Sequence, residues 1–323
     1  MAYFLVSVSN RKNLEDCIKY SLAGFTNSIN GFWTFVEIEE GDYISFLYGA
    51  RVFNLYKVIQ KKSYKNFENL PPWPPVTFSM SGRTYYFPFR LELKPIRELN
   101  EPMVRPEFAF VAENLLLRGG YRKTHFQADA STFYNVSQMG EIYRSKIEKL
   151  ELEKGETFTP LITWNKSLVK IPFRFYFHEF FLQSLIRHWL SCKENLDNFF
   201  EKIELPYSPR KFEVVSEKAL PEGHIDLLIK DKQPEGISRK IIIEVKTGRA
   251  LAKDILQIEK YMEELKEECK RGVLVAKSIS RKLVKIASSK NIFCFEYDFS
   301  NLKNSKCYTF KELLKNIKLE LIK

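Results

Sequence analysis

Residues that bind metals or form disulfides are scarce in this chain. Its 323 residues include 5 cysteines and 4 histidines. The cysteines show no paired spacing and the histidines are scattered, so we expect reduced thiols and no structural zinc site. This cysteine usage is typical of a cytoplasmic protein.

Long apolar runs are also missing. No apolar stretch is long enough to cross a bilayer, so we expect neither a transmembrane helix nor a membrane partner. The opening residues, MAYFLVSVSNRKN, place apolar side chains before basic ones, which is the reverse of a secretory signal peptide. There is no internal repeat and no low-complexity tract.

The chain is instead rich in apolar and basic residues. Hydrophobic residues make up 45% of it and aromatic residues 15%, which is enough for two domain cores at this length. The net charge of +11 favours a polyanionic partner but does not choose among DNA, RNA and acidic surfaces. Many soluble proteins are equally basic, so the charge alone does not establish nucleic-acid binding.

The N-terminal part, residues 1–135, predicts a compact α+β, barrel-like domain. Short runs rich in aromatic and β-branched residues predict strands, and residues 13–24 carry apolar side chains at helical spacing. The runs are YFLVSVS, FWTFVEI, DYISFLYG, VFNLYKVIQ and YYFPFRLEL. Residues 136–159 are highly charged with a sparse apolar stripe, which predicts a connecting helix and linker.

The C-terminal part, residues 160–323, predicts an α/β domain. Its order is a helix, three strands, a helix, a strand, a helix and a strand. The corresponding segments are 178–196, then 211–218, 224–230 and 239–246, then 252–270, 271–277, 280–290 and 292–298.

Charged residues interrupt two of these predicted strands. Asp226 opens the apolar part of HIDLLI, and Glu244 and Lys246 end the apolar run of KIIIEVKTG. Side chains two apart share one face of a strand, and an antiparallel turn can bring Asp226 beside Glu244. Two carboxylates and an amine suit Mg2+ or Mn2+, an ion that activates water and stabilises charge on a phosphate. A surface salt bridge is the alternative for an isolated pattern of this kind.

With the element order around them, Asp226, Glu244 and Lys246 resemble the PD-(D/E)XK nuclease superfamily, whose restriction-endonuclease-like core is α-β-β-β-α-β. The resemblance implies that Asp226 and Glu244 ligate the ion with the carbonyl of Val245. It also implies that Lys246 positions the attacking water. The segments GHIDLL, IIIEVKTG and RGVLVAKSIS are similar to the C-terminal domain of EndoMS/NucS nucleases. His224 departs from that family, which usually has arginine there.

Three further residues resemble the RecB-like branch of this superfamily. Gln257 and Tyr261 match its Gln-x3-Tyr pattern, and Glu179 lies where the branch often has an additional acidic residue. The resemblance implies that Gln257 and Tyr261 support the scissile phosphate or the lysine. Glu179 would bind a second ion or support the first.

The stretch from Tyr3 to Phe35, followed by GDYISFLYGARVFNLYKV, resembles the YTH branch of the PUA/EVE superfamily and the DNA-binding domain of some McrB restriction proteins. These barrel-like domains accept a modified base in an aromatic pocket, where stacking contributes about 1–3 kcal/mol per base. The resemblance implies that Trp73 belongs to an aromatic cage and that Ser9 and Asn13 contact the base.

One cage position of the YTH pattern is occupied by Ala23, so another ring has to replace the missing tryptophan. Trp33 and Phe35 are the candidates. The alternative is that these two rings belong to the barrel core, whereas Trp73 lies in a proline-flanked loop.

The basic loop RGGYRK adds a predicted contact to the DNA backbone through Arg118, Arg122 and Lys123. A solvated loop explains this composition equally well.

These features together predict a modification-dependent endonuclease that cuts double-stranded DNA with Mg2+ or Mn2+. Its N-terminal domain would flip and read a methylated base, with methyladenine favoured, in restriction or defence. One nuclease site per chain suggests a homodimer for cutting both strands. The alternatives are a mismatch- or structure-specific repair endonuclease and a nucleic-acid-binding regulator that does not cut.

Overall fold

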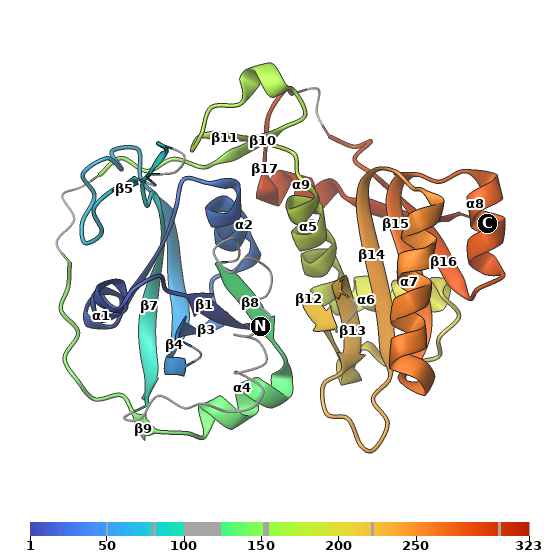
Figure 1. The fold of residues 1–323 in the computed structure, drawn as a ribbon, viewed down its shortest axis with the longest axis horizontal. Helices are drawn as coiled ribbons and strands as arrows, with labels where there is room; N and C mark the ends of the chain where they lie inside the picture. Colours follow the sequence, from blue (N-terminus) through green and yellow to red (C-terminus); the bar gives the residue numbers. More distant parts are fainter. Residues whose placement is uncertain are drawn as a thin grey trace. The chain divides into compact units, whose positions relative to one another are not determined.

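The computed structural model describes residues 1–49, 51–77, 79, 82–99, 124–150, 155–220, 223–302 and 305–322. The chain forms two compact units, Met1–Tyr176 and Phe177–Lys323 (Figure 1). Within the described residues, no helix is both long enough and apolar enough to cross a membrane.

A twisted, largely antiparallel sheet forms the centre of the first unit. Among the described strands of this sheet, β1 and β3 form the parallel pair, and β9 extends the pairing at one end of β7. The strand order is β2 (Leu22–Phe25), β7 (Phe89–Glu98), β4 (Arg51–Ser63), β3 (Tyr43–Tyr48), β1 (Tyr3–Ser7) and β8 (His125–Ala128), with β9 at Glu141–Ile142. The helices are α1 (Arg11–Tyr20), α2 (Ile29–Glu37) and α4 (Ala130–Ser137), and β5 (Val76–Thr77) and β6 (Thr84–Tyr85) form a separate hairpin.

Helix α2 supplies much of the aromatic core of this unit. The Ser28 hydroxyl caps its first turn by accepting the Gly31 N–H at 3.1 Å. Phe32 stacks on Phe175 with ring centroids 4.4 Å apart. Phe35 stacks on Phe89 at 5.2 Å.

Two expectations for the first unit are wrong. The predicted barrel is an open sheet, because among the described residues no pairing joins the edge strands β2 and β8. The predicted connecting helix at 136–159 is also missing from its described part: α4 ends at Ser137 and Ile142 pairs with Arg97 on β7. Gly140 turns the chain there with φ +62, at a point where an added Cβ would lie 2.1 Å from the Glu98 carbonyl oxygen.

The boundary between the units falls at Tyr176, later than the predicted start of the second domain at residue 160. Backbone hydrogen bonds tie the preceding segment to the first unit, among them Phe158 N–H to the Ser63 carbonyl at 2.9 Å. The strands β10 (Leu161–Thr163) and β11 (Arg174–Tyr176) then pair in parallel and place Phe175 against α2.

The second unit has the α/β core that its sequence predicts. Its six-stranded sheet has the order β12 (Phe212–Leu220), β13 (Gly223–Asp231), β14 (Lys240–Arg249), β15 (Cys269–Ser278), β16 (Ile292–Asp298) and β18 (Lys318–Ile322). The helices are α5 (Glu179–Ser191), α6 (Lys193–Lys202), α7 (Ala252–Leu265), α8 (Arg281–Ser288) and α9 (Phe310–Asn316), which follows the short β17 (Tyr308–Thr309). The order α5, β12, β13, β14, α7, β15 confirms the predicted α-β-β-β-α-β core.

Helices cover both faces of this sheet. On one face, side chains of α7 and α8 share an apolar cluster with Leu274 and Cys294. On the other, Phe199 of α6 stacks on Phe295 with centroids 5.2 Å apart. Neighbouring residues Cys294 and Phe295 point to opposite faces of β16, so the sheet is the middle layer of a three-layer unit.

Replacing Phe175 with alanine should destabilise the first unit by about 3–5 kcal/mol, because it removes a fully buried ring that stacks on Phe32. Thermal unfolding of Phe175→Ala should show its transition at a lower temperature. The control Val169→Ala, at an exposed position, should change the transition temperature little. Equal transitions for both variants would mean that residues 155–176 are not part of this unit's core.

Candidate active site

The site begins where the β13–β14 ladder stops. The two strands pair from Lys230↔Lys240 to Leu227↔Ile243 and no further. At the next position the Asp226 carboxylate accepts the Val245 N–H at 2.8 Å through Oδ2. A side chain thus takes over a backbone hydrogen bond, so the strands separate and Asp226 is held at the opening.

Helix α5 holds the other oxygen of Asp226. Gln183 donates its Nε2–H to Asp226 Oδ1 at 2.7 Å, and its own side chain is 3% exposed. Gln183 was not among the residues predicted for the site. A signal was available, since Gln183 lies four positions after Glu179 on the same helical face and interrupts the apolar run EFFLQSLI.

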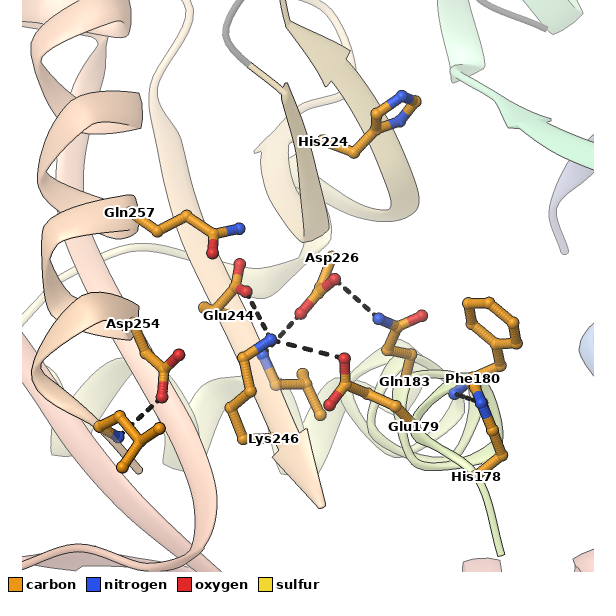
Figure 2. Close-up of polar contacts among 12 residues, drawn as sticks. His178, Glu179, Phe180, Gln183, His224, Asp226, Glu244, Lys246, Asp254 and Gln257 are labelled. Carbon is orange, nitrogen blue, oxygen red and sulfur yellow. Dashed lines mark hydrogen bonds and ion pairs between the residues drawn. The ribbon is translucent and has the colours of Figure 1, made fainter. Parts of the chain in front are cut away.

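Glu244 and Lys246 lie side by side on β14 and face Asp226, as predicted (Figure 2). The Lys246 ammonium donates to Glu244 Oε1 at 2.8 Å and to Glu179 Oε1 of α5 at 3.4 Å. Figure 2 shows Asp226, Glu244, Lys246 and Glu179 converging from two strands and one helix. The sequence-predicted acids and lysine are therefore together in one place.

The charges in this cluster shift one another's pKa values. Burial and then the charge of Glu244 raise the pKa of Asp226 well above its ordinary value. Burial raises the pKa of Glu244 to about 7. Burial lowers the pKa of Lys246, but the carboxylates of Glu244 and Asp226 outweigh it and hold that pKa above its ordinary value. The lysine is thus a cation at neutral pH, and protons compete for both acids.

A polar cavity of about 370 Å³ opens beside the cluster. Glu179, Lys246 and Gln257 line it together with the strand-to-helix turn between β14 and α7. That turn brings two more basic side chains, Arg249 and Lys253, which the sequence analysis did not single out. The cavity thus combines Glu179 and Asp254 with three basic side chains next to the Asp226–Glu244 pair, and these cations suit an anionic substrate.

The residues present fit a divalent cation. Glu244 is 1% exposed, and its Oε2 has no hydrogen-bond partner among the described residues. An ion between Glu244 and Asp226 would occupy this oxygen and offset both the burial of the two charges and the repulsion that Glu244 exerts on Asp226. Within the described part of the chain no group of three or more His, Cys, Asp and Glu side chains is arranged to hold a metal ion, so Asp226 and Glu244 would supply two ligands here. The remaining ligands of such an ion would therefore be water, phosphate or backbone oxygens.

Gln257 and Tyr261 lie on the face of α7 that points toward the site, but they bond to each other and to β13. Gln257 Nε2–H donates to the Tyr261 hydroxyl at 3.1 Å, which in turn donates to the His224 carbonyl at 3.0 Å. An added Cβ on Gly223 would lie 2.5 Å from that hydroxyl. Tyr261 therefore fixes the start of the strand that carries Asp226.

The residues predicted for a base pocket do not form one cage. Ser9 and Asn13 lie together on the surface, where Asn13 Nδ2–H donates to the Ser9 hydroxyl at 3.2 Å. Trp33 is 1% exposed and packs edge-on against His125 at 4.6 Å. Phe35 stacks on Phe89 in the core. Neither ring replaces the tryptophan missing at position 23, because α2 buries both.

Trp73 lies against a buried cation instead. Its ring stacks on the Arg90 guanidinium at 4.3 Å and lies so close to Gly24 that an added Cβ there would be 2.3 Å away. Burial lowers the pKa of Arg90 to about 9. Its Nε and Nη1 have no hydrogen-bond partner within the described residues. The predicted backbone contacts Arg118, Arg122 and Lys123 lie outside the described residues.

The three-layer core with paired acids and a lysine at the end of a strand pair agrees with the core expected from the PD-(D/E)XK resemblance. Residues 200–313, about a third of the chain, match the family model described as the endonuclease NucS C-terminal domain. This range contains Asp226, Glu244 and Lys246 but not Glu179 and Gln183 of α5. A comparison with curated proteins gives no significant match.

Among solved structures, the chain is similar to a repair endonuclease from Pyrococcus abyssi, with 23% identity, a TM-score of 0.23 and coverage of 31% of this chain and 42% of that one. An EndoMS complex with double-stranded DNA gives 20% identity, a TM-score of 0.23 and the same coverage. The DNA modification-dependent restriction endonuclease AspBHI gives 14% identity and a TM-score of 0.21 over 84% of this chain and 62% of that one. The chain thus spans less than half of the first two proteins, and TM-scores this low carry no functional argument.

Metal affinity should rise with pH, while the stability of the metal-free protein should fall. The folded Glu244 carboxyl holds its proton up to about pH 7, against an ordinary pKa of 4.5, so the metal-free fold loses stability as pH rises through this window. Mn2+ must displace that proton, so its affinity should fall about tenfold per pH unit below 7. Thermal unfolding with chelator and with Mn2+ between about pH 5 and 8 measures both trends. In Glu244→Gln the Mn2+ shift should be largely lost, and the metal-free trend should shrink to the part that buried Asp226 contributes. An Mn2+-induced stabilisation of the parent that does not change with pH would contradict the assignment.

Replacing Gln183 with leucine should weaken Mn2+ binding by about 10- to 100-fold, because Asp226 loses the donor that orients it. Calorimetric titration of Mn2+ tests this, with circular dichroism to check that the variant folds. Unchanged affinity in a folded variant would show that Gln183 only fills space.

Proposed function

We propose that this protein is a metal-dependent endonuclease that hydrolyses phosphodiester bonds in DNA. The observation that carries this proposal is the cluster of Asp226, Glu244 and Lys246 beside a polar cavity. The match of residues 200–313 to an endonuclease domain family supports it. A salt bridge alone does not account for the cluster, because Glu244 is buried with one oxygen lacking a partner among the described residues.

Asp226 and Glu244, with the Val245 carbonyl, would hold Mg2+ or Mn2+. When bound, such an ion activates water and neutralises charge on the phosphate. Lys246 remains protonated, so its part is to orient the attacking water and stabilise negative charge rather than to remove a proton. Arg249 and Lys253 on the cavity wall would attract the DNA backbone.

Glu179 and the pair Gln257 and Tyr261 have supporting roles in this proposal. Glu179 accepts a hydrogen bond from the Lys246 ammonium and so holds it at the mouth of the cavity. Tyr261 fixes the backbone two residues before Asp226. Gln257 reaches the cavity itself and so is the member of the pair that can contact a phosphate.

The first unit would direct the cutting by reading a methylated base in double-stranded DNA, with methyladenine favoured and methylated cytosine as the other candidate. Trp73 and Arg90 are the residues that support this part of the proposal. A ring in a proline-flanked loop over a buried guanidinium can stack on an extruded base once the loop moves, while Arg90 donates to its edge. A domain that recognises a modified base, joined to a nuclease domain, suits a role in restriction or defence. Two copies of the chain would be needed to cut both strands.

A repair endonuclease acting on mismatched or branched DNA is the second candidate. The family match supports it, because the matching segment includes the strands that carry Asp226 and Glu244. A regulator that binds without cutting is less favoured, since both acids and the lysine are present and face one another.

Cleavage of methylated, unmethylated and mismatched duplexes of otherwise identical sequence distinguishes these functions. With Mg2+, the proposal expects cutting of the methylated duplex, whereas a repair nuclease would cut the mismatched one. Lys246→Ala should lower the rate by about 100-fold or more. The matched control Lys282→Ala, on the exposed side of α8, should leave it unchanged. Binding without any metal-dependent cutting would leave only the regulator.

A further inference from the structure

An ordered and exposed apolar patch lies in the segment that contains β10 and β11. Its inner residues Ile162 and Phe175 are 0% exposed and anchor the two paired strands in the first unit. Its outer residues are apolar but open to solvent, with Trp164 40%, Ile171 47% and Tyr176 38% exposed. The segment thus presents aromatic surface from a fixed base; we call residues 161–176 the stacking patch.

Paired strand ends bring the backbones of the two outer aromatic residues close together. Thr163 pairs with Tyr176 in the parallel ladder, and Trp164 follows Thr163 directly. The loop that joins the strands is held by backbone hydrogen bonds between Lys170 and Arg174, at 3.0 and 2.8 Å. The loop geometry is therefore defined even though its apolar side chains are exposed.

The charged residues of this segment have a single sign. No Asp or Glu occurs between residues 157 and 178, whereas Lys166, Lys170 and Arg174 all fall within the stacking patch. The Lys166 ammonium lies 5.5 Å from the centre of the Tyr176 ring. Exposed rings interleaved with cations, and no carboxylate in the segment, fit a polyanion that also carries flat apolar groups.

We propose that the stacking patch binds an unstacked base of single-stranded or locally opened DNA on Trp164 and Tyr176. Lys166, Lys170 and Arg174 hold the adjoining phosphates. The inference rests on the proposed function for its choice of DNA as ligand. A second copy of the chain is a poorer occupant, since two such patches would bring like charges together.

The patch would add a strand-holding function to the nuclease. Tyr176 is three residues before Glu179 in the sequence, so the patch leads directly into the helix that carries Glu179 and Gln183. A base lifted out of the duplex and held on Trp164 would keep the local strands apart. Base stacking tolerates any sequence, because every base has an aromatic face.

Tryptophan fluorescence tests the proposal in the full-length protein. Of the four tryptophans, Trp164 is the most exposed, with Trp33 at 1% and Trp73 at 5%. A Lys246→Ala background without metal prevents cutting. Titration with a single-stranded oligothymidylate should quench the emission more than titration with a duplex of the same length, and Trp164→Phe should remove most of that quenching.

Affinity measurements supply the quantitative test. Trp164→Ala and Tyr176→Ala should each weaken oligothymidylate binding by about 5- to 150-fold. Tyr176→Phe, which keeps the ring, should bind like the parent, as should Lys282→Ala, which changes an exposed lysine of the second unit. Parental affinity in both alanine variants overturns the proposal, as does the finding that Trp164→Ala abolishes self-association while leaving DNA affinity intact. These measurements do not depend on DNA cleavage. A parent protein that does not cut DNA would contradict the proposed nuclease function, and the stacking patch would still be tested by DNA affinity.

Discussion

The second unit depends on the electrostatic conflict between Asp226 and Glu244. Two carboxylates on adjoining strands, one of them 1% exposed, cannot both be charged in a protein interior without compensation. Lys246 supplies part of that compensation by bonding to Glu244, and backbone and side-chain donors to Asp226 supply more. One oxygen of Glu244 remains without a donor within the described residues. A divalent cation bound by both acids would offset this conflict.

The Asp226 side chain also determines where the pairing of β13 and β14 ends. The Asp226 side chain takes the Val245 N–H, and the ladder of β13 and β14 ends at that point. The strands separate, and the cavity lined by Lys246, Arg249 and Lys253 opens beside them. The same acid thus ends the sheet pairing and provides a ligand, while Tyr261 holds the backbone before it.

The sequence predicted the second unit well because its signals are local. Apolar runs identify the strands, and charged residues within them stand out against that background, as Glu244 does in KIIIEVKTG. The role of Gln183 could not be predicted, because glutamine is common in amphipathic helices and its contact with Asp226 depends on how α5 packs against β13. The first unit was predicted less well, because strand runs do not show whether a sheet closes. Trp33 and Phe35 share the composition of a binding cage, and only the packing of α2 shows that they belong to the core.

Locating a cation tests the central claim most directly. Crystals soaked in Mn2+ and measured at its absorption edge should show an anomalous peak between Asp226 and Glu244, close to Glu244 Oε2. The peak should be absent from Asp226→Asn crystals treated in the same way. A peak at another position would contradict the account. So would the absence of a peak in crystals where Asp226 stays bonded to Gln183 and Glu244 to Lys246.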